Sequence, residues 1–240
     1  MRAMSQSDKF RKISNQLLRS LPSETLSRLL PHLEPVELAR GRVIDYAGKS
    51  ITKLHFIDRG LVSLVKTMRD GRTVEIGTIG IEGAADPKAL VGVDRAHVET
   101  IVQVPGQAFR IERSVLMDVM ERDDALRDVI RAYVGFVIGQ IVQTAACNRL
   151  HSLEERCCRW LLIAHDSALC DTFPLTHEFL AMMLGTQRAG VSISASCLKK
   201  AGLISYRHGQ VTILDRVGLE HASCECYETQ QAERKRLFRL

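Results

Sequence analysis

Cysteine is absent from the first part of this chain: none precedes Cys147, and the seven present are scattered between Cys147 and Cys226. A metal centre built on N-terminal cysteines is therefore excluded. An odd number of cysteines at irregular spacing favours reduced thiols over a disulfide framework. Cys224 and Cys226 lie near His221 but lack a second cysteine pair, so we expect structural or exposed thiols there and no metal site.

Long hydrophobic runs are also missing. No apolar stretch reaches 18 residues, which argues against a transmembrane helix, and residues 1–14 lack the apolar stretch of a signal peptide. The chain has no nucleophile elbow, no P-loop, no Rossmann glycine fingerprint and no zinc-site spacing. We therefore expect a cytoplasmic protein that is not an enzyme, does not bind a membrane and carries no cofactor.

The composition is that of a globular protein whose charge is compatible with nucleic acid. The 240 residues are 45% hydrophobic, which is enough for two modest domains with cores of their own. The 33 Lys and Arg residues exceed the 28 Asp and Glu residues, giving a formal net charge of +5. Many proteins with other functions are as basic, so this charge only supports a nucleic-acid partner.

The most informative stretch, residues 175–204, reads as two short helices joined by a tight turn. Thr176 can supply the N-cap oxygen of the first helix. The apolar stripe of this helix consists of Phe179, Leu180, Met183 and Leu184. Gly185 can adopt the positive φ of a sharp turn, and Thr186 can cap a second helix over residues 187–200.

The second helix has one packing face and one short, polar, positive face. Its apolar positions are Val191, Ala195 and Leu198. Its polar positions are Gln187, Arg188, Ser192, Ser194, Ser196 and Lys199. Such a helix can lie in a DNA major groove, although an ordinary helix pair has the same spacing. Residues 202–214 then form two short β segments around a glycine-containing turn, which completes a winged helix.

Residues 175–214 resemble the DNA-binding domain of the Crp/Fnr family of bacterial transcription regulators. The resemblance rests on a first helix of the LTxxxLAxxLG type, on Arg188 at the start of the second helix, and on the AGLIxY run at 201–206. It implies that Arg188 donates two hydrogen bonds to a guanine, and that Gln187 and Thr186 touch phosphate. It also implies a homodimer that binds double-stranded DNA, with RNA polymerase as a further candidate partner.

Two positions depart from the family pattern. The next base-reading position, often a glutamate, is Ala189, and a later arginine position is Ile193, so the operator should differ from that of the best-known members. Candidate contacts to a base edge or a thymine methyl are Ala189, Ser192 and Ile193. Candidate phosphate contacts are His177, Lys199, Lys200, Arg207 and His208. For each basic residue the alternative is a solvated charge. We expect residues 230–240 to be frayed, with several basic side chains that attract phosphate.

Residues 36–111 show short apolar alternations separated by turns, which predicts a β-roll or jelly roll. This section resembles the cyclic-nucleotide-binding fold of the same family, in which a Gly-Glu pair holds the ribose and an arginine pairs with the phosphate. Here Gly80 and Glu82 stand in the loop, and Arg95 stands one position early. Because a one-residue slip turns a strand side chain to the opposite face, we expect no cyclic-nucleotide gating or a different signal. The alternatives are a pocket that uses Glu82 and a plain solvated loop.

Two lone histidines, His55 and His97, would be the haem ligands if the chain carried a haem, but lone histidines in strands are usually surface or satisfied residues.

The long helix that comes next, near residues 122–151, has a broad apolar face at spacings of three and four: Leu126, Ile130, Tyr133, Val137, Ile141 and Ala145. It predicts a dimerisation helix, with a core helix lying on the β-roll as the alternative. Ser152 and Glu155 form a capping box after a hinge near 148–152, and Trp160 should be a core residue.

The predicted fold is therefore α+β with three parts. Residues 1–121 form a β-roll sensor domain with a helical lead-in over the first 40 residues, residues 122–151 the dimerisation helix, and residues 152–240 the winged helix-turn-helix domain. The predicted function is sequence-specific transcription regulation by a homodimer whose effector, if it has one, is unknown. A ligand-gated regulator and a protein-interaction adaptor without DNA binding are the alternatives.

Overall fold

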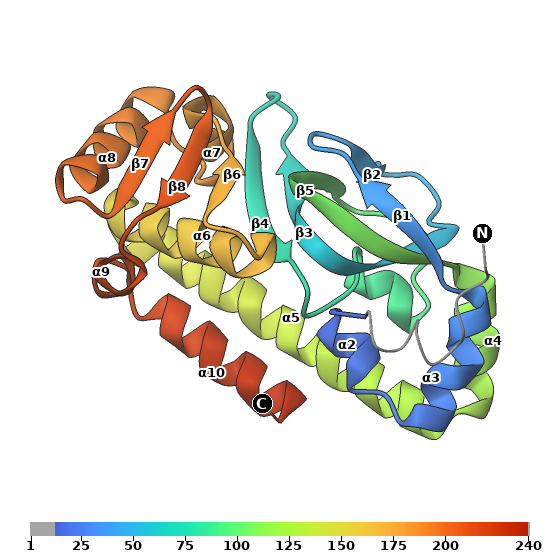
Figure 1. Ribbon diagram of the computed structural model, residues 1–240. Coiled ribbons are helices and arrows are strands. Elements are labelled where there is room, and N and C mark those ends of the chain that lie inside the picture. The colour runs from blue at the N-terminus through green and yellow to red at the C-terminus, as the bar shows by residue number, and fades with distance from the viewer. Residues whose placement is uncertain (1–12, 240) are drawn as a thin grey trace.

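The computed structural model describes residues 13–239 and confirms the predicted α+β class. A β-roll lies at one end, the winged helix-turn-helix region at the other, and one long helix runs beneath both (Figure 1). The predicted helical lead-in lies partly outside the described residues, since residues 1–12 are not described. Within the described residues the lead-in is helical only as far as His32.

The N-terminal helices hold the chain against the β-roll. They are α2 (Gln16–Arg19), α3 (Ser23–Leu29) and the 3₁₀ helix η1 (Leu30–His32). Asn15 is fully buried; its side-chain oxygen accepts a hydrogen bond from the Leu18 amide, and its Nδ2 donates to the carbonyls of Ile57 and Gly83. One side chain thus caps a helix and ties it to two segments of the roll.

The sheet of the β-roll is antiparallel, with the strand order β1-β5-β3-β4 and with β2 beside β5. Its strands are β1 (Glu34–Leu38), β2 (Val43–Asp45), β3 (Lys53–Thr67), β4 (Thr73–Ile79) and β5 (Glu99–Glu112), with the 3₁₀ helix η2 (Pro87–Val91) between β4 and β5. Register shifts near Gly60 bend the long pair β3 and β5. Gly60 has φ +97°, and a Cβ there would lie 2.6 Å from the Val104 carbonyl oxygen, so the bend requires glycine.

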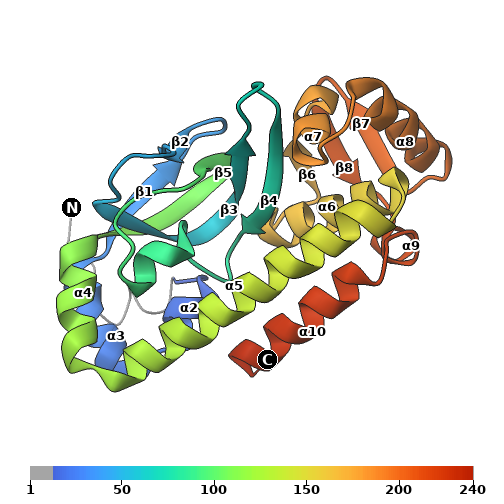
Figure 2. The same cartoon turned by 180° about the vertical axis from the view of Figure 1, so that it is seen from behind.

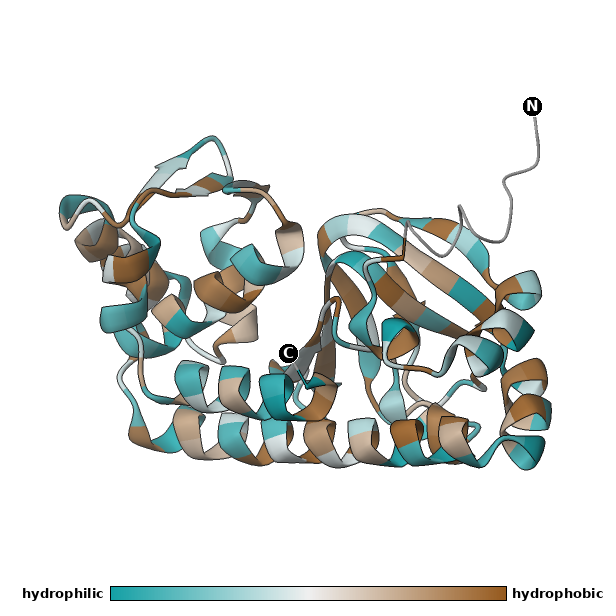
Figure 3. Cartoon of the chain, turned by 60° about the horizontal axis from the view of Figure 1, so that its bottom comes forward, coloured by the Kyte–Doolittle hydropathy of each residue, from teal (hydrophilic) through white to brown (hydrophobic). Residues whose placement is uncertain are grey.

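Two helices connect the roll to the rest of the chain: α4 (Arg113–Arg122) and α5 (Asp124–Leu150). Asp123 caps α5 by accepting a hydrogen bond from the Leu126 amide. One face of α5 is buried against the roll through Leu126, Ile130, Tyr133 and Val137. By length and composition alone, α5 is apolar enough to cross a membrane, although the sequence shows no long uninterrupted apolar run. Figure 3 shows hydrophobic residues recurring along its length.

The C-terminal region begins with α6 (Leu153–Ala168), where the predicted capping box of Ser152 and Glu155 is present. Its further elements are β6 (Thr172–Pro174), α7 (His177–Met183), α8 (Arg188–Lys200), β7 (Ile204–Arg207), β8 (Gln210–Ile213), α9 (Arg216–His221) and α10 (Cys226–Phe238). The three strands form one antiparallel sheet in the order β6-β8-β7. Trp160 on α6 is buried, as predicted.

The expectation that residues 230–240 fray is wrong for the described residues. They belong to α10, which runs back along α5 (Figure 2). Gln230 is buried, Arg234 donates to the Gln16 side chain at 2.9 Å, and Leu237 and Phe238 pack against the core beneath the β-roll. The basic side chains of this segment therefore lie on a packed helix and not on a free tail.

Candidate nucleic-acid interface

Local sequence determines the geometry of the α7–α8 turn. Thr176 caps α7 by accepting a hydrogen bond from the Phe179 amide, and Gly185 takes φ +60° between the helices, both as predicted. The expected cap of α8 by Thr186 is not observed: the N-cap is Gln187, without a side-chain cap hydrogen bond. Gly190 brings α8 close to α6, since a Cβ there would lie 2.9 Å from Leu153 Cδ2.

The two faces of α8 divide as the spacing predicts except at Ser194, a predicted polar position that is buried. Val191, Ala195 and Leu198 are buried. The exposed positions are Gln187, Arg188, Ala189, Ile193, Ser196, Cys197, Lys199 and Lys200. Ile193 is 67% exposed, which is unusual for a large apolar side chain. No acidic residue lies on α8, so its open face is small, uncharged at the centre and positive at both ends.

Ser192 and His177 do not lie free on this surface. Ser192 Oγ donates to the Arg188 carbonyl and lies 2.9 Å from His177 Nδ1. The His177 ring stacks on Tyr206 with 4.4 Å between centroids, and the Tyr206 hydroxyl donates to the Leu175 carbonyl. Burial lowers the pKa of His177, and the charge of Arg188 lowers it further. His177 is therefore neutral near pH 7 and holds α7, α8 and β7 together.

The wing presents two of the predicted phosphate contacts. Arg207 and His208 are exposed at the end of the β7–β8 hairpin. His208 has φ +51° and Gly209 φ +73°, the left-handed pair that a two-residue hairpin turn requires. The β7–β8 hairpin and α8 belong to the same end of the molecule (Figure 1).

The structure does not bring together the three predicted ligand residues of the β-roll. Glu82 is buried, and its Oε1 accepts from the Gly80 amide at 2.8 Å, beside a small cavity lined by α5, α6 and α10. Arg95 is exposed and donates to the Gly48 carbonyl at 2.7 Å. Of the two lone histidines, His55 is buried and His97 is exposed, with its Nδ1 3.0 Å from Lys88 Nζ.

The loop that carries Glu82 is instead fastened to the long helix. The Tyr133 hydroxyl accepts from the Ala84 amide at 3.0 Å and donates to the Ala84 carbonyl at 3.2 Å. A Cβ on Gly83 would overlap the Tyr133 ring, so only glycine allows this approach. The sequence predicts Tyr133 on the apolar face of α5 but gives no sign of its hydroxyl contacts, because they join residues 49 positions apart.

Comparison with known proteins identifies the C-terminal region and the fold. Residues 155–222 match a family model described as the Crp-like helix-turn-helix domain. Comparison with curated proteins gives no match. FixK2 from Bradyrhizobium japonicum is similar in structure, with a TM-score of 0.68 and 15% identity over 80% of this chain and 98% of FixK2.

Two further solved structures share the fold. A transcriptional regulator of the CRP family from Thermus thermophilus has a TM-score of 0.64 and 21% identity, over 78% of this chain and 96% of its own. The c-di-GMP responsive global regulator CLP from Xanthomonas campestris has a TM-score of 0.63 and 17% identity, over 80% and 99%. At these identities the likeness shows the fold, while the helix-turn-helix match identifies the domain.

Proposed function

We propose that this chain, which has the fold of Crp/Fnr regulators and carries a Crp-like helix-turn-helix domain, regulates transcription by binding specific DNA sites as a homodimer. The observation that carries the proposal is the open face of α8. Arg188 is exposed in its first turn, small residues come next, and no acid lies on the helix. Such a face fits a major groove, where arginine reads guanine with two hydrogen bonds and small side chains permit close approach.

The residues around Arg188 can each be assigned a role in DNA binding. Ala189 and Ile193 lie on the same open face and offer only apolar contacts, which suit a thymine methyl. Thr186, Gln187 and Lys199 lie at the two ends of α8, and Arg207 and His208 on the wing, where they would meet phosphates. Ser192 and His177 are engaged with each other, so we assign them to positioning α8 and not to direct contact.

A homodimer is supported by an apolar seam on the face of α5 that points away from the β-roll. The seam consists of exposed residues spaced alternately by three and four, namely Gly135, Ile138, Val142 and Ala145, and the charged Arg149 follows at the next position. Ile138 is 58% exposed and Val142 64% exposed. This spacing is that of a coiled-coil contact between two helices. A two-fold dimer would present two α8 helices to successive major grooves, which one chain cannot do.

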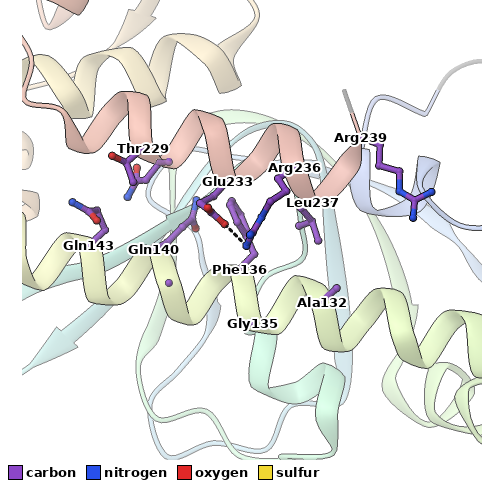
Figure 4. A pocket seen from close by; sticks show the side chains of 12 residues that line it. Ala132, Gly135, Phe136, Gln140, Gln143, Thr229, Glu233, Arg236, Leu237 and Arg239 are labelled. Carbon is purple, nitrogen blue, oxygen red and sulfur yellow. Dashed lines mark ion pairs between the residues drawn. The ribbon is translucent and has the colours of Figure 1, made fainter.

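The groove beside this seam leaves room for close helix contact. It measures about 650 Å³ and lies between α5 and α10 (Figure 4). On the α5 side it is lined by the small residues Ala132, Gly135 and Gly139 and by the larger Phe136, Gln140 and Gln143. On the α10 side Glu233 pairs with Arg236 at 2.7 Å. A second α5 would approach most closely at Gly135 and Gly139, which carry no side chain.

The contacts of the β-roll support DNA binding that does not depend on cyclic nucleotide. Arg95 is engaged at Gly48, and Glu82 is engaged within its own loop. Asp86, at the end of that loop, is 1% exposed, and neither of its carboxylate oxygens has a hydrogen-bond partner among the described residues. Burial, together with the charge of the neighbouring Asp86, raises the pKa of Asp45 to about 6. While they are ionised, these two carboxylates would repel a nucleotide phosphate.

The test is selection of bound sequences from a random duplex pool by the purified protein, with and without cAMP. We expect a two-fold symmetric site in both conditions. Arg188→Ala should cost about 1–3 kcal/mol at one base position in each half-site and relax specificity there. Recovery of a site only in the presence of cAMP would contradict ungated binding, and no enriched site in either condition would contradict the proposed function.

Lys199→Ala is the matched control. Its charge lies at the end of α8 and is assigned to phosphate, so its loss should weaken binding about equally on all sequences. The slope of the logarithm of the binding constant against the logarithm of salt concentration should also fall by about one, since one fewer counterion is released. If Arg188→Ala also weakened all sequences equally, the assignment of Arg188 to a base would be wrong.

A further inference from the structure

Three cysteines and one histidine meet where the long helix ends. Cys147 and His151 lie four residues apart in the last turn of α5 and its cap, and therefore on one side of the helix. Cys224 lies in the segment that connects α9 to α10, and Cys226 is the first residue of α10. One ligand atom from each of the four residues lies within 4.8 Å of all the others. The three cysteines are buried and form a small cluster of their own.

Two of the distances between these atoms match a tetrahedral site for one ion. Cys147 Sγ and Cys224 Sγ are 3.6 Å apart, and Cys226 Sγ and His151 Nδ1 are 3.5 Å apart. Zinc bonds of about 2.3 Å to sulfur and about 2.0 Å to nitrogen place tetrahedral ligands roughly 3.5–3.8 Å from one another. Four donors within 4.8 Å of one another leave space for one ion and not for an iron–sulfur cluster.

The surroundings orient the donors. His151 Nε2 lies 3.1 Å from Glu225 Oε2, so Nε2 carries the proton and Nδ1 is free to bind a metal. A histidine ligand that donates its other nitrogen to a carboxylate is the usual arrangement around protein-bound zinc. Gln143 Nε2 donates to Cys226 Sγ at 3.0 Å, a hydrogen bond that a metal-bound thiolate would also accept.

Two arginines on α6 supply positive charge beside the cysteines. Arg159 is 4% exposed, and its Nε has no hydrogen-bond partner among the described residues. Arg156 is half-buried, and its charge also interacts with Cys147 and Cys224. Arg159 lies close enough to Cys147 for its charge to act on that sulfur. Three thiolates with a divalent ion carry one net negative charge, which these buried guanidinium groups would balance.

We propose that Cys147, His151, Cys224 and Cys226 bind one Zn²⁺ ion. Soft thiolates with one imidazole in tetrahedral geometry select zinc among the common divalent ions, and binding would release the thiol protons to solvent. With four protein ligands and no open position, the site is structural. The ion fastens the start of α10 to the end of α5, next to the hinge at 150–152. This proposal does not depend on DNA binding.

The proposal is tested on the full-length protein, purified under reducing conditions without chelator. We expect one zinc per chain by elemental analysis. Co²⁺ added to the metal-free protein should give the visible absorption of tetrahedral thiolate coordination. Cys224→Ser and Cys226→Ser should lose both signals. Cys170→Ser, which removes an exposed thiol, should retain both.

Two variants of His151 separate a lost ligand from a misfolded chain. His151→Cys supplies a fourth thiolate and should still bind one ion, whereas His151→Ala should weaken binding by at least about tenfold. Chelation should lower the melting temperature of the wild-type protein and leave that of Cys226→Ser unchanged. A wild-type protein with seven free thiols and no bound Zn²⁺ or Co²⁺ would overturn the proposal. So would wild-type metal binding by Cys224→Ser, or a Cys147–Cys224 disulfide in the purified protein.

Discussion

Glu75 on β4 shows how a single residue can make this structure sensitive to pH. It is buried where the β-roll meets α6, accepts hydrogen bonds from Ser63 Oγ and from Trp160 Nε1, and lies near the charge of Arg159. Burial raises the pKa of Glu75 to about 7 despite these partners. The carboxyl is therefore protonated in the folded protein at a pH at which it is ionised in the unfolded chain.

The sign of the pH dependence is set by this raised pKa. Between about 4.5 and about 7 the folded state holds a proton that the unfolded state has lost, so the free energy of unfolding falls as pH rises. Glu75→Gln should remove this decline, which is on the order of 3 kcal/mol. The measurement is urea unfolding over a pH series. Glu121→Gln, on the exposed surface of α4, should retain the wild-type slope. A slope unchanged by Glu75→Gln would refute the assignment.

Some functional residues could be found from the sequence and others could not. The outward position of Arg188 can be predicted from local sequence alone. The cap at Thr176, the turn at Gly185 and the apolar positions of the second helix together determine which of its residues face outward. Cys147 and Cys224 are 77 residues apart, and only the return of α10 along α5 brings them together. The sequence pairs Cys224 and Cys226 with His221, the nearest histidine along the chain. The structure places His151 there instead.

At the scale of elements, α5 has two apolar faces with different partners. One is buried against the β-roll, and the other carries the exposed seam. The sequence alone does not assign the faces, because apolar residues at spacings of three and four occur on both. The structure assigns Leu126, Ile130, Tyr133 and Val137 to the core, and it leaves Ile138 and Val142 exposed among the described residues.

This division predicts the effect of a charge in the seam. Ile138→Lys would place two lysines opposite each other in the proposed dimer, while the buried face of α5 stays intact. We expect the dimer dissociation constant to rise by at least about a hundredfold, since like charges brought together cost several kcal/mol. Sedimentation equilibrium gives the constant, and circular dichroism checks the monomer fold. Met68→Lys, at an apolar site 54% exposed near the β3–β4 turn, should leave the dimer unchanged.

The helix α10 could not be predicted from its own sequence. Residues 226–238 are dominated by charged and polar side chains with no clear apolar stripe, which is typical of a solvated tail. The helix is held by contacts at its two ends. Cys226, Tyr227 and Gln230 are buried in its first half, while Leu237 and Phe238 pack beneath the β-roll. These contacts join distant parts of the chain, and no local pattern reports them.

At the scale of the whole molecule, the β-roll and the winged helix-turn-helix region share one hydrophobic core. Leu61, Val65 and Val104 of the roll pack in the same cluster as Trp160 of α6 and Val191 of α8. Gln103 Nε2 also donates to Met183 Sδ at 3.2 Å, and Arg40 lies 5.6 Å from the centre of the Phe179 ring. Two domains joined only by a linker would share no such core.

We therefore expect the two regions to unfold together. Trp160, the only tryptophan, reports on the C-terminal region by its fluorescence, and far-ultraviolet circular dichroism reports on the whole chain. At one fixed protein concentration the two signals should give the same urea midpoint. Leu61→Ala opens a cavity on the roll side of the shared core and should cost about 2–5 kcal/mol, shifting both signals equally. A tryptophan transition that kept its wild-type midpoint in this variant would show that the regions unfold independently.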